Sequence, residues 1–230
     1  MSKAIAINGS PRMAKGNTAM VLTPFIQGMT SAGSEVELFY ASHLKVKPCS
    51  CGEMYCWNKA PGECCIQDDM QLLYPRLREA DVLILATPVY VPLPGDMQNV
   101  VNRLVPLLDP FLTFRVGRTR ARFRADVGIR KMVLVATSGW WEQGNLETVL
   151  RIARELAADA SVEFAGAVLR PHASLMRKGG ELTPDGEAVL NAAREAGYDL
   201  VKNGAMRQET LEAISRPLIS QEELWRRYDQ

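Results

Sequence analysis

Short apolar runs alternate along the chain with segments in which apolar residues recur every three or four positions. The runs predict five strands at 3–8, 35–40, 81–90, 131–139 and 162–170, the first of them buried on both faces. The longer spacing predicts one helix that begins at Asn17-Thr18 and carries apolar residues to Met29, and others at 68–80, 95–109, 142–159 and 183–204. This alternation favours a three-layer α/β domain with a mostly parallel sheet.

Three features interrupt this regular order. Residues 48–65 hold every cysteine of the chain, and Pro75 is expected to interrupt or bend the helix at 68–80. Residues 114–128 carry five arginines without clear periodicity, which we interpret as an excursion on the surface. We therefore expect one domain over 1–204 that includes the cysteine-rich loop, and an amphipathic arm at 205–230 that packs on the body or on another subunit.

The composition narrows the classes of partner. A chain of 230 residues with 47% hydrophobic residues can bury a sizeable core. Its formal net charge of +1 argues against nucleic acid and anionic membranes as partners. The chain has no apolar run of about 18 residues, and its start lacks the pattern of a secretory signal, so we expect a cytoplasmic protein. In that reducing compartment, clustered cysteines favour metal or redox chemistry over structural disulfides.

Ligands of open parallel sheets bind outside the carboxyl ends of the strands, so the loops that follow the strands are the candidate site. The first loop, "NGSPRMAKGNT" (8–18), lacks the GxxxxGK[ST] and GxGxxG motifs. Its hydroxyl groups, its glycines and the following helix N-terminus suit a phosphate group. The alternative is an ordinary polar loop with a helix cap.

Two later loops offer aromatic side chains. The loop "TPVYVPLPGDMQN" (87–99) places Tyr90 among apolar residues, which suits a flat heterocycle, although Tyr90 could also lie at the edge of the core. The loop "TSGWWEQGN" (137–145) carries Trp140 and Trp141, which cannot both point into one core. At least one of them is expected to line a pocket or an interface.

Together these three loops resemble the flavin loops of the NADPH-dependent FMN reductase family, especially its iron–sulfur flavoprotein branch, from about Ser2 to Arg170. The resemblance implies a flavodoxin-like fold, with a five-stranded parallel sheet in the order 2-1-3-4-5 and FMN at its carboxyl edge. Many relatives carry Lys in place of Asn99 and Asp-Arg in place of Asn102-Arg103. The resemblance implies that FMN is bound by Ser10, Arg12, Gly16, Asn17, Thr18, Pro88, Val89, Tyr90, Val91, Ser138, Gly139 and Trp140.

The cysteine loop departs from the spacing of that branch. The branch has C-x-x-C-x-x-C followed by a fourth cysteine, whereas this chain has C-x-C-x4-C-x7-C with one more cysteine adjacent. The resemblance implies a [4Fe–4S] cluster, in which Cys65 is either spare or takes the place of one of the other four cysteines. Thiolate ligands favour iron–sulfur clusters or zinc over hard cations. A structural zinc and a loop without metal remain as alternatives. The implied cluster ligands are Cys49, Cys51, Cys56 and Cys64.

The resemblance implies an FMN-dependent NAD(P)H oxidoreductase that passes electrons to a second, small-molecule or protein acceptor, either directly or through the cluster. The chemistry is centred on the flavin, so no catalytic side chain is assigned. The alternatives are a flavin electron carrier for a ferredoxin-like partner and a cysteine-rich metal-binding protein on the same scaffold.

Three further expectations concern specificity and assembly. The arginines at 115–124 could bind the 2′-phosphate of NADPH, or they could form a solvated face or a subunit contact. His172 could touch substrate or be a structural histidine. A homo-oligomer, either a dimer or a tetramer, is expected because the arm exposes more apolar surface than a free tail should. The apolar residues of the arm are Leu211, Ile214, Leu218, Ile219, Leu224 and Trp225.

Overall fold

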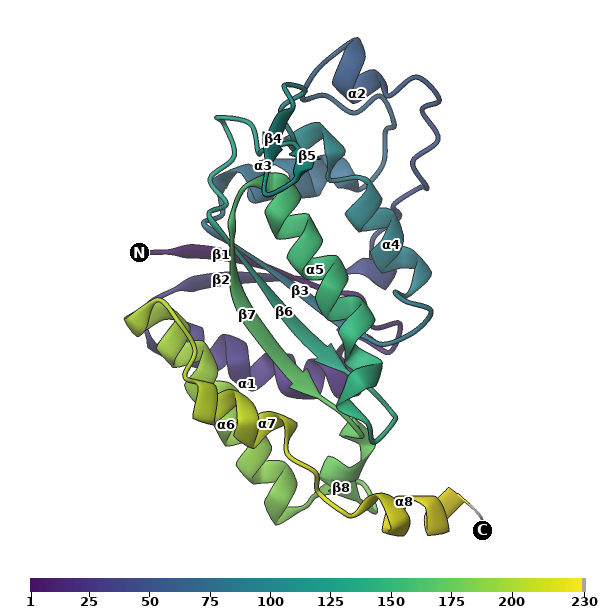
Figure 1. The fold of residues 1–230 in the computed structure, drawn as a ribbon, viewed down its shortest axis with the longest axis vertical. Helices are drawn as coiled ribbons and strands as arrows, with labels where there is room; N and C mark the ends of the chain where they lie inside the picture. The colour runs from purple at the N-terminus through teal and green to yellow at the C-terminus, as the bar shows by residue number, and fades with distance from the viewer. Residues whose placement is uncertain (229–230) are drawn as a thin grey trace.

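A central sheet of five parallel strands organises the computed structural model, which describes residues 1–228 (Figure 1). The strands lie in the order β2-β1-β3-β6-β7, so the predicted α/β fold and its 2-1-3-4-5 order are confirmed. Asn8 at the end of the first strand aligns with Ala86, and Pro88 aligns with Thr137, so these strands end at one edge. The strand bounds are Lys3–Asn8 (β1), Glu35–Tyr40 (β2), Val82–Pro88 (β3), Lys131–Thr137 (β6) and Glu163–Arg170 (β7).

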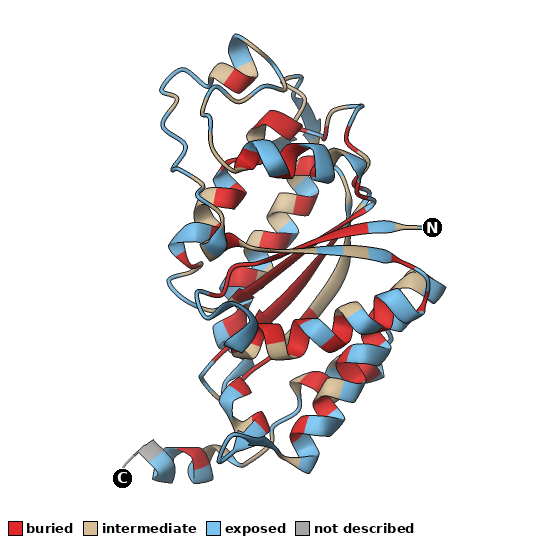
Figure 2. Ribbon diagram, turned by 180° about the vertical axis from the view of Figure 1, so that it is seen from behind, coloured by how far each residue is buried: buried red, intermediate tan, exposed pale blue. Residues whose placement is uncertain are grey.

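Helices cover both faces of the sheet. On one face, α1 (Asn17–Ser31) and α6 (Pro184–Asn203) bury their apolar side chains against the central strands. On the other face, the core is formed with α3 (Met70–Glu79), α4 (Gly95–Asn102) and α5 (Glu147–Ala160). Figure 2 shows the middle strands buried along their length, as expected when apolar layers lie on both sides.

The backbones of α1 and α6 touch each other through two glycines. A Cβ atom on Gly28 would lie 1.9 Å from the carbonyl oxygen of Arg194, and one on Gly197 would lie 2.0 Å from that of Phe25. These distances are far below van der Waals contact, and backbone atoms cannot swing aside as a flexible side chain can. Only glycine therefore permits this helix contact.

One local prediction was wrong, and two other segments are more regular than the sequence indicated. The helix predicted over 95–109 ends at Asn102, because Pro106 has no N–H to continue the helix, and the chain continues as a 3-10 turn (Val105–Leu107, η3). The helix α3 runs through Pro75 without interruption. The segment 114–128, interpreted as an excursion on the surface, contains most of a hairpin, β4 (Thr113–Arg115) and β5 (Arg118–Arg120), whose turn residues both have positive φ.

The C-terminal arm packs on the body of its own chain. Its helices are α7 (Gln208–Ser215) and α8 (Gln221–Tyr228). Ile214 and Leu224 are buried, whereas the Trp225 side chain is 56% exposed. The arm therefore exposes less apolar surface than the sequence indicated, and it supplies only weak support for a subunit interface. Exposed apolar side chains gather instead on the segment 111–116, at Phe111, Leu112, Phe114 and Val116.

The remaining described elements are short. None of the helices among residues 1–228 combines the length and the apolar character that a membrane span requires. The short elements are Met13–Lys15 (η1), Ala41–His43 (η2), Tyr55–Asn58 (α2), Gln143–Leu146 (η4), Ala173–Met176 (η5), Arg177–Lys178 (β8) and Glu181–Leu182 (β9).

Candidate functional site

The loop after β1 closes tightly over the start of α1. A Cβ atom on Gly16 would lie 2.6 Å from the Ser10 hydroxyl oxygen, so a larger residue would displace Ser10. No side chain of the described residues caps α1, since its N-cap position is Gly16. The first N–H groups of α1 thus remain as donors at the positive end of the helix dipole. This geometry suits an anion such as a phosphate group.

The side chains predicted for this loop have different surroundings. The Thr18 hydroxyl is buried and lies 2.8 Å from the hydroxyl of Thr137 at the end of β6. This bond ties the Thr18 side chain to the end of β6, and Thr137 is a partner that sequence reasoning missed. Asn17 is partly exposed and Arg12 is exposed, so both side chains can reach a ligand from solvent. Ser10 is buried, and its hydroxyl accepts a hydrogen bond from the Arg12 N–H.

The loop after β3 contributes a partly apolar surface. Tyr90 is 51% exposed and Val91 is fully exposed, whereas Pro88 and Val89 are half-buried. Two N–H groups of this loop are already engaged, because Val89 donates to the Thr137 carbonyl at 2.8 Å and Tyr90 donates to the Pro92 carbonyl at 3.0 Å. The N–H of Val91 is therefore the remaining backbone donor between Pro88 and Pro92.

The loop after β6 lies next to these two loops in the order of the sheet. Ser138 is buried, and its hydroxyl accepts a hydrogen bond at 3.0 Å from the N–H of Trp140. Gly139 is exposed and the Trp140 side chain is 60% exposed. Because β1, β3 and β6 are neighbours in the sheet, their three loops share its carboxyl edge. A helix N-terminus and exposed aromatic side chains therefore occur along one edge.

The cysteine loop lies at the other end of α4. This eight-residue helix starts after the β3 loop and runs away from it, and α2 packs at its far end against η3. The helix is about 12 Å long. In Figure 1, α2 accordingly lies at the opposite end of the view from α8. The cysteines therefore do not join the three loops at the carboxyl edge.

The five thiols lie near one another without forming a ready-made metal site. The sulfur atoms of Cys49 and Cys51 are 3.8 Å apart. Burial, followed by the charges of Cys51, Cys64 and Cys49, raises the pKa of Cys56 to about 11. Burial opposes ionisation of Cys51, but hydrogen bonds from the Tyr55 backbone and from Cys49 outweigh it and lower the pKa of Cys51. Across residues 1–228, no three His, Cys, Asp or Glu side chains are grouped to hold a metal ion.

A buried ion pair fixes the base of the cysteine loop. Arg103 donates to both carboxylate oxygens of Asp68, at 2.7 and 3.1 Å. The same guanidinium donates to the carbonyls of Lys47 and Ile66, which lie on either side of the cysteines. Asp68 in turn accepts N–H bonds from Lys47 and Met70. Sequence reasoning named Arg103 only beside the departure at Asn102 and missed this role.

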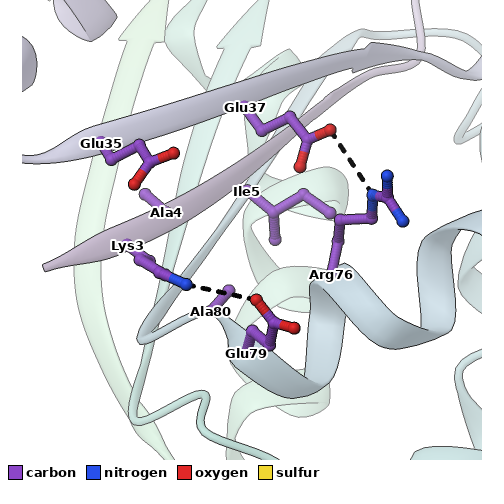
Figure 3. Close-up of a pocket in the computed structure, with 8 residues that line it drawn as sticks. All are labelled: Lys3, Ala4, Ile5, Glu35, Glu37, Arg76, Glu79 and Ala80. Atoms are coloured by element: carbon purple, nitrogen blue, oxygen red, sulfur yellow. Dashed lines mark hydrogen bonds and ion pairs between the residues drawn. The ribbon is translucent and has the colours of Figure 1, made fainter.

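A separate cavity lies at the amino edge of the sheet (Figure 3). It has a volume of about 80 Å³, which suits a few water molecules but not a flavin. Its charged side chains largely pair with one another, since Lys3 bonds to Glu79 at 3.2 Å and Arg76 to Glu37 at 3.6 Å. We therefore place no ligand there.

The arginine-rich hairpin also lies away from the carboxyl edge. Arg118 and Arg120 pair with Glu155, and Arg115 bonds to Ser161 beyond the end of α5. Because α5 runs antiparallel to the strands, its end at Ala160 lies at the amino edge. These arginines are thus distant from a nicotinamide bound at the carboxyl edge of the same chain.

Comparison with known proteins decides the family. A sequence model of the NADPH-dependent FMN reductase family matches residues 2–149. The chain belongs to this family. The match covers β1, β3 and β6 with their three loops, so the edge described above is the part of the chain that is shared with other FMN reductase family members.

Individual relatives agree with this membership. An iron–sulfur flavoprotein of Archaeoglobus fulgidus is 36% identical over 106 residues, which are 45% of this chain and 46% of the relative. An iron–sulfur flavoprotein of Methanosarcina thermophila is 31% identical over 107 residues, 46% of this chain and 53% of the relative. The chain thus spans about half the length of the curated relatives it matches.

Solved structures share the fold. An NAD(P)H:quinone oxidoreductase from Methanothermobacter marburgensis has a TM-score of 0.58 at 19% identity, covering 86% of this chain and 96% of that chain. An FMN-dependent NADH-azoreductase from Bacillus anthracis, in complex with FMN, has a TM-score of 0.58 at 12% identity, covering 89% of this chain and 100% of that chain. At these identities the likeness establishes the fold alone.

Proposed function

We propose that this FMN reductase family member is an FMN-dependent NAD(P)H oxidoreductase that passes electrons to a second acceptor. One observation carries the proposal: the N-terminus of α1 has no side-chain cap among the described residues, and Gly16 at its N-cap position lies tightly against Ser10. It suits the terminal phosphate of a mononucleotide, and the chain has no dinucleotide motif for an adenosine half. Family membership supports the same cofactor.

The chain's own residues would bind and orient the cofactor. The N–H groups of Asn17 and Thr18 would hold the phosphate, with Arg12 adding charge from solvent. The flavin ring would lie against Pro88 to Val91 on one side and Ser138 to Trp140 on the other. The bound flavin supplies the hydride and electron transfer, while the aromatic side chains shape the space for nicotinamide and acceptor.

One substitution can test the phosphate site without breaking the helix. Asn17→Pro removes one backbone donor at the first helical position, where proline is tolerated. Gly16 already has φ −83° and ψ 157°, the extended conformation that a following proline requires. We expect the variant to weaken FMN binding by about 1.5–3 kcal/mol, the scale of a hydrogen bond to a charged group.

The matched control is Asn17→Ala, which removes the side chain but keeps the N–H. A larger loss for Asn17→Pro than for Asn17→Ala, measured by quenching of flavin fluorescence, supports the backbone site. Equal dissociation constants for the two variants would remove it. Steady NAD(P)H oxidation with a quinone or ferricyanide separates a reductase from an electron carrier, which would oxidise NAD(P)H slowly.

We also propose that the cysteine loop can hold a [4Fe–4S] cluster after rearranging around the metal. Five soft thiol donors within one loop support this, as does the similarity to the iron–sulfur flavoproteins of Archaeoglobus fulgidus and Methanosarcina thermophila. Protein purified without oxygen should then contain about four irons and four sulfides per chain, and Cys56→Ser should remove most of the iron while FMN stays bound. Iron-free protein after anaerobic reconstitution would reject the cluster and leave zinc to be tested.

We further propose a homo-oligomer, for which the exposed apolar segment 111–116 gives better support than the C-terminal arm. Light scattering at micromolar concentration tests this. A monomer mass would refute it.

A further inference from the structure

Two buried basic side chains lie at the end of β7. Arg170 and His172 are both 0% exposed. The guanidinium of Arg170 donates to the Pro171 carbonyl at 2.6 Å and lies 2.7 Å from the His172 Nε2 atom. No carboxylate among residues 1–228 is recorded as its ion-pair partner. A buried cation without an acid requires another source of negative potential.

The C-terminal end of α7 provides that potential. Arg170 Nη1 donates to the carbonyls of Ile214 at 2.6 Å and Arg216 at 3.0 Å, where the last carbonyls of α7 lack partners inside the helix. The negative end of the helix dipole thus faces the guanidinium. Arg170 therefore fastens α7 to the end of the sheet.

His172 fastens the residues that follow α7, which we call the C-terminal strap (216–221). Its Nε2 atom accepts the Leu218 N–H at 3.1 Å, so this nitrogen must be unprotonated. Its ring stacks on Trp141, with centroids 6.4 Å apart and planes 13° apart. Trp141 Nε1 donates to the Ile219 carbonyl at 3.0 Å. The ring of His172 therefore contacts both the strap and the loop after β6.

Two more bonds join the same segments. The His172 N–H donates to the Trp140 carbonyl at 2.7 Å. Gln221 at the start of α8 donates to the Glu142 carboxylate at 2.8 Å. The loop after β6, which we call the β6 loop (138–142), is thus bonded both to His172 and to the strap.

We propose that Arg170 and His172 are positioning residues that lock the C-terminal strap onto the β6 loop and thereby hold Ser138 to Trp140 in place beside the flavin ring. The flavin part of this inference rests on the proposed function. The mechanical part concerns only contacts within the chain, so it can be tested without any cofactor.

The test is hydrogen–deuterium exchange of the flavin-free full-length chain, followed by FMN titration. His172→Phe keeps a ring to stack on Trp141 but lacks the acceptor for Leu218, whereas His172→Gln restores an acceptor. Arg227→Ala is the control, because Arg227 pairs with Glu223 inside α8 and not with the strap or the β6 loop among the described residues. We expect His172→Phe to speed exchange in both the strap and the β6 loop at least about 10-fold and to raise the FMN dissociation constant several-fold. The Gln variant should return toward wild type.

The outcomes separate the two proposals. Unchanged exchange in the β6 loop of His172→Phe overturns the lock, whether or not the strap is released. Faster exchange in both segments with an unchanged FMN dissociation constant overturns the positioning role. If the wild-type chain binds no FMN, the proposed function and the positioning role fail together, but the exchange data still decide the lock.

A second variant covers the case in which His172→Phe does not fold. Trp141→Phe retains an aromatic ring against His172 but removes the bond to the Ile219 carbonyl. It should raise exchange in the strap and in the β6 loop together. Exchange that rises in only one of the two segments would overturn the lock.

Discussion

Replacing Arg103 with methionine tests how the cysteine loop is held. Methionine keeps an unbranched apolar side chain but removes every donor of the guanidinium. The Arg103 and Asp68 side chains are only 1% and 2% exposed, so water cannot replace the lost bonds. The variant leaves the Asp68 carboxylate buried with two N–H donors but no opposite charge.

The expected loss of unfolding free energy is about 3–5 kcal/mol, the cost of removing one partner from a buried ion pair. Arg151→Met is the matched control, since it makes the same chemical change in a pair whose arginine is 64% exposed. Exposed pairs contribute at most about 1 kcal/mol, and Glu155 keeps its bonds to two other arginines. The difference between the variants therefore isolates the buried pair.

Urea unfolding at pH 7 measures both losses. Because Arg103 bonds to the backbone on either side of the cysteines, the buried Cys56 should also be alkylated faster in the folded Arg103→Met variant. A loss below about 1 kcal/mol, equal to that of the control, would refute the reasoning. So would an unchanged alkylation rate of Cys56 combined with a large loss of stability, because the pair would then stabilise the body and not the loop.

Three further outcomes follow from single sites. Burial, followed by the Arg170 charge, lowers the pKa of His172 from 6.5 to about 4, so the unfolded chain gains this proton at a higher pH than the folded chain. Calorimetry should therefore show the free energy of unfolding falling by up to about 3 kcal/mol between pH 6.5 and 4, a fall that His172→Gln should lack. Gly28→Ala should cost at least about 2 kcal/mol in chemical denaturation, because its Cβ would meet a carbonyl oxygen at 1.9 Å, whereas Gly144→Ala, with open space around it, should cost much less. Mass spectrometry of iodoacetamide-treated metal-free protein should find Cys51 modified before Cys56, and the reverse order would contradict the pKa directions given above.

The sheet could be predicted from the sequence because its signal is local. The central strands are apolar runs, and strand–helix alternation leaves few arrangements of a parallel sheet. The hairpin at 113–120 was missed because its strands are only three residues long. The residue in the sequence that could have indicated it is Gly117, because a two-residue hairpin loop favours glycine. In the structure both loop residues, Val116 and Gly117, have positive φ.

The partners of the candidate site could not be predicted, because they come from distant positions. Thr18 bonds to Thr137 across 119 positions, so a hydroxyl that is predicted to bind the cofactor also links the start of α1 to the end of β6. At least one of Trp140 and Trp141 was expected to line a pocket or an interface, but the sequence did not show that the indole N–H of Trp141 bonds to the strap 78 positions later. No periodic pattern carries such information, since it depends on where two separate elements end.

The two buried arginines, Arg103 and Arg170, differ in whether their partners can be recognised in the sequence. Arg103 is matched by Asp68, an acid whose position just before α3 is visible in the sequence, so the pair could be suspected once the fold is known. Arg170 is matched by carbonyl groups at the end of α7, which any residue type provides. The compensating charge there comes from the direction of a helix and not from a side chain. A substitution in the strap can therefore preserve the acceptors of Arg170 completely, whereas a change in the length of α7 would move them out of reach.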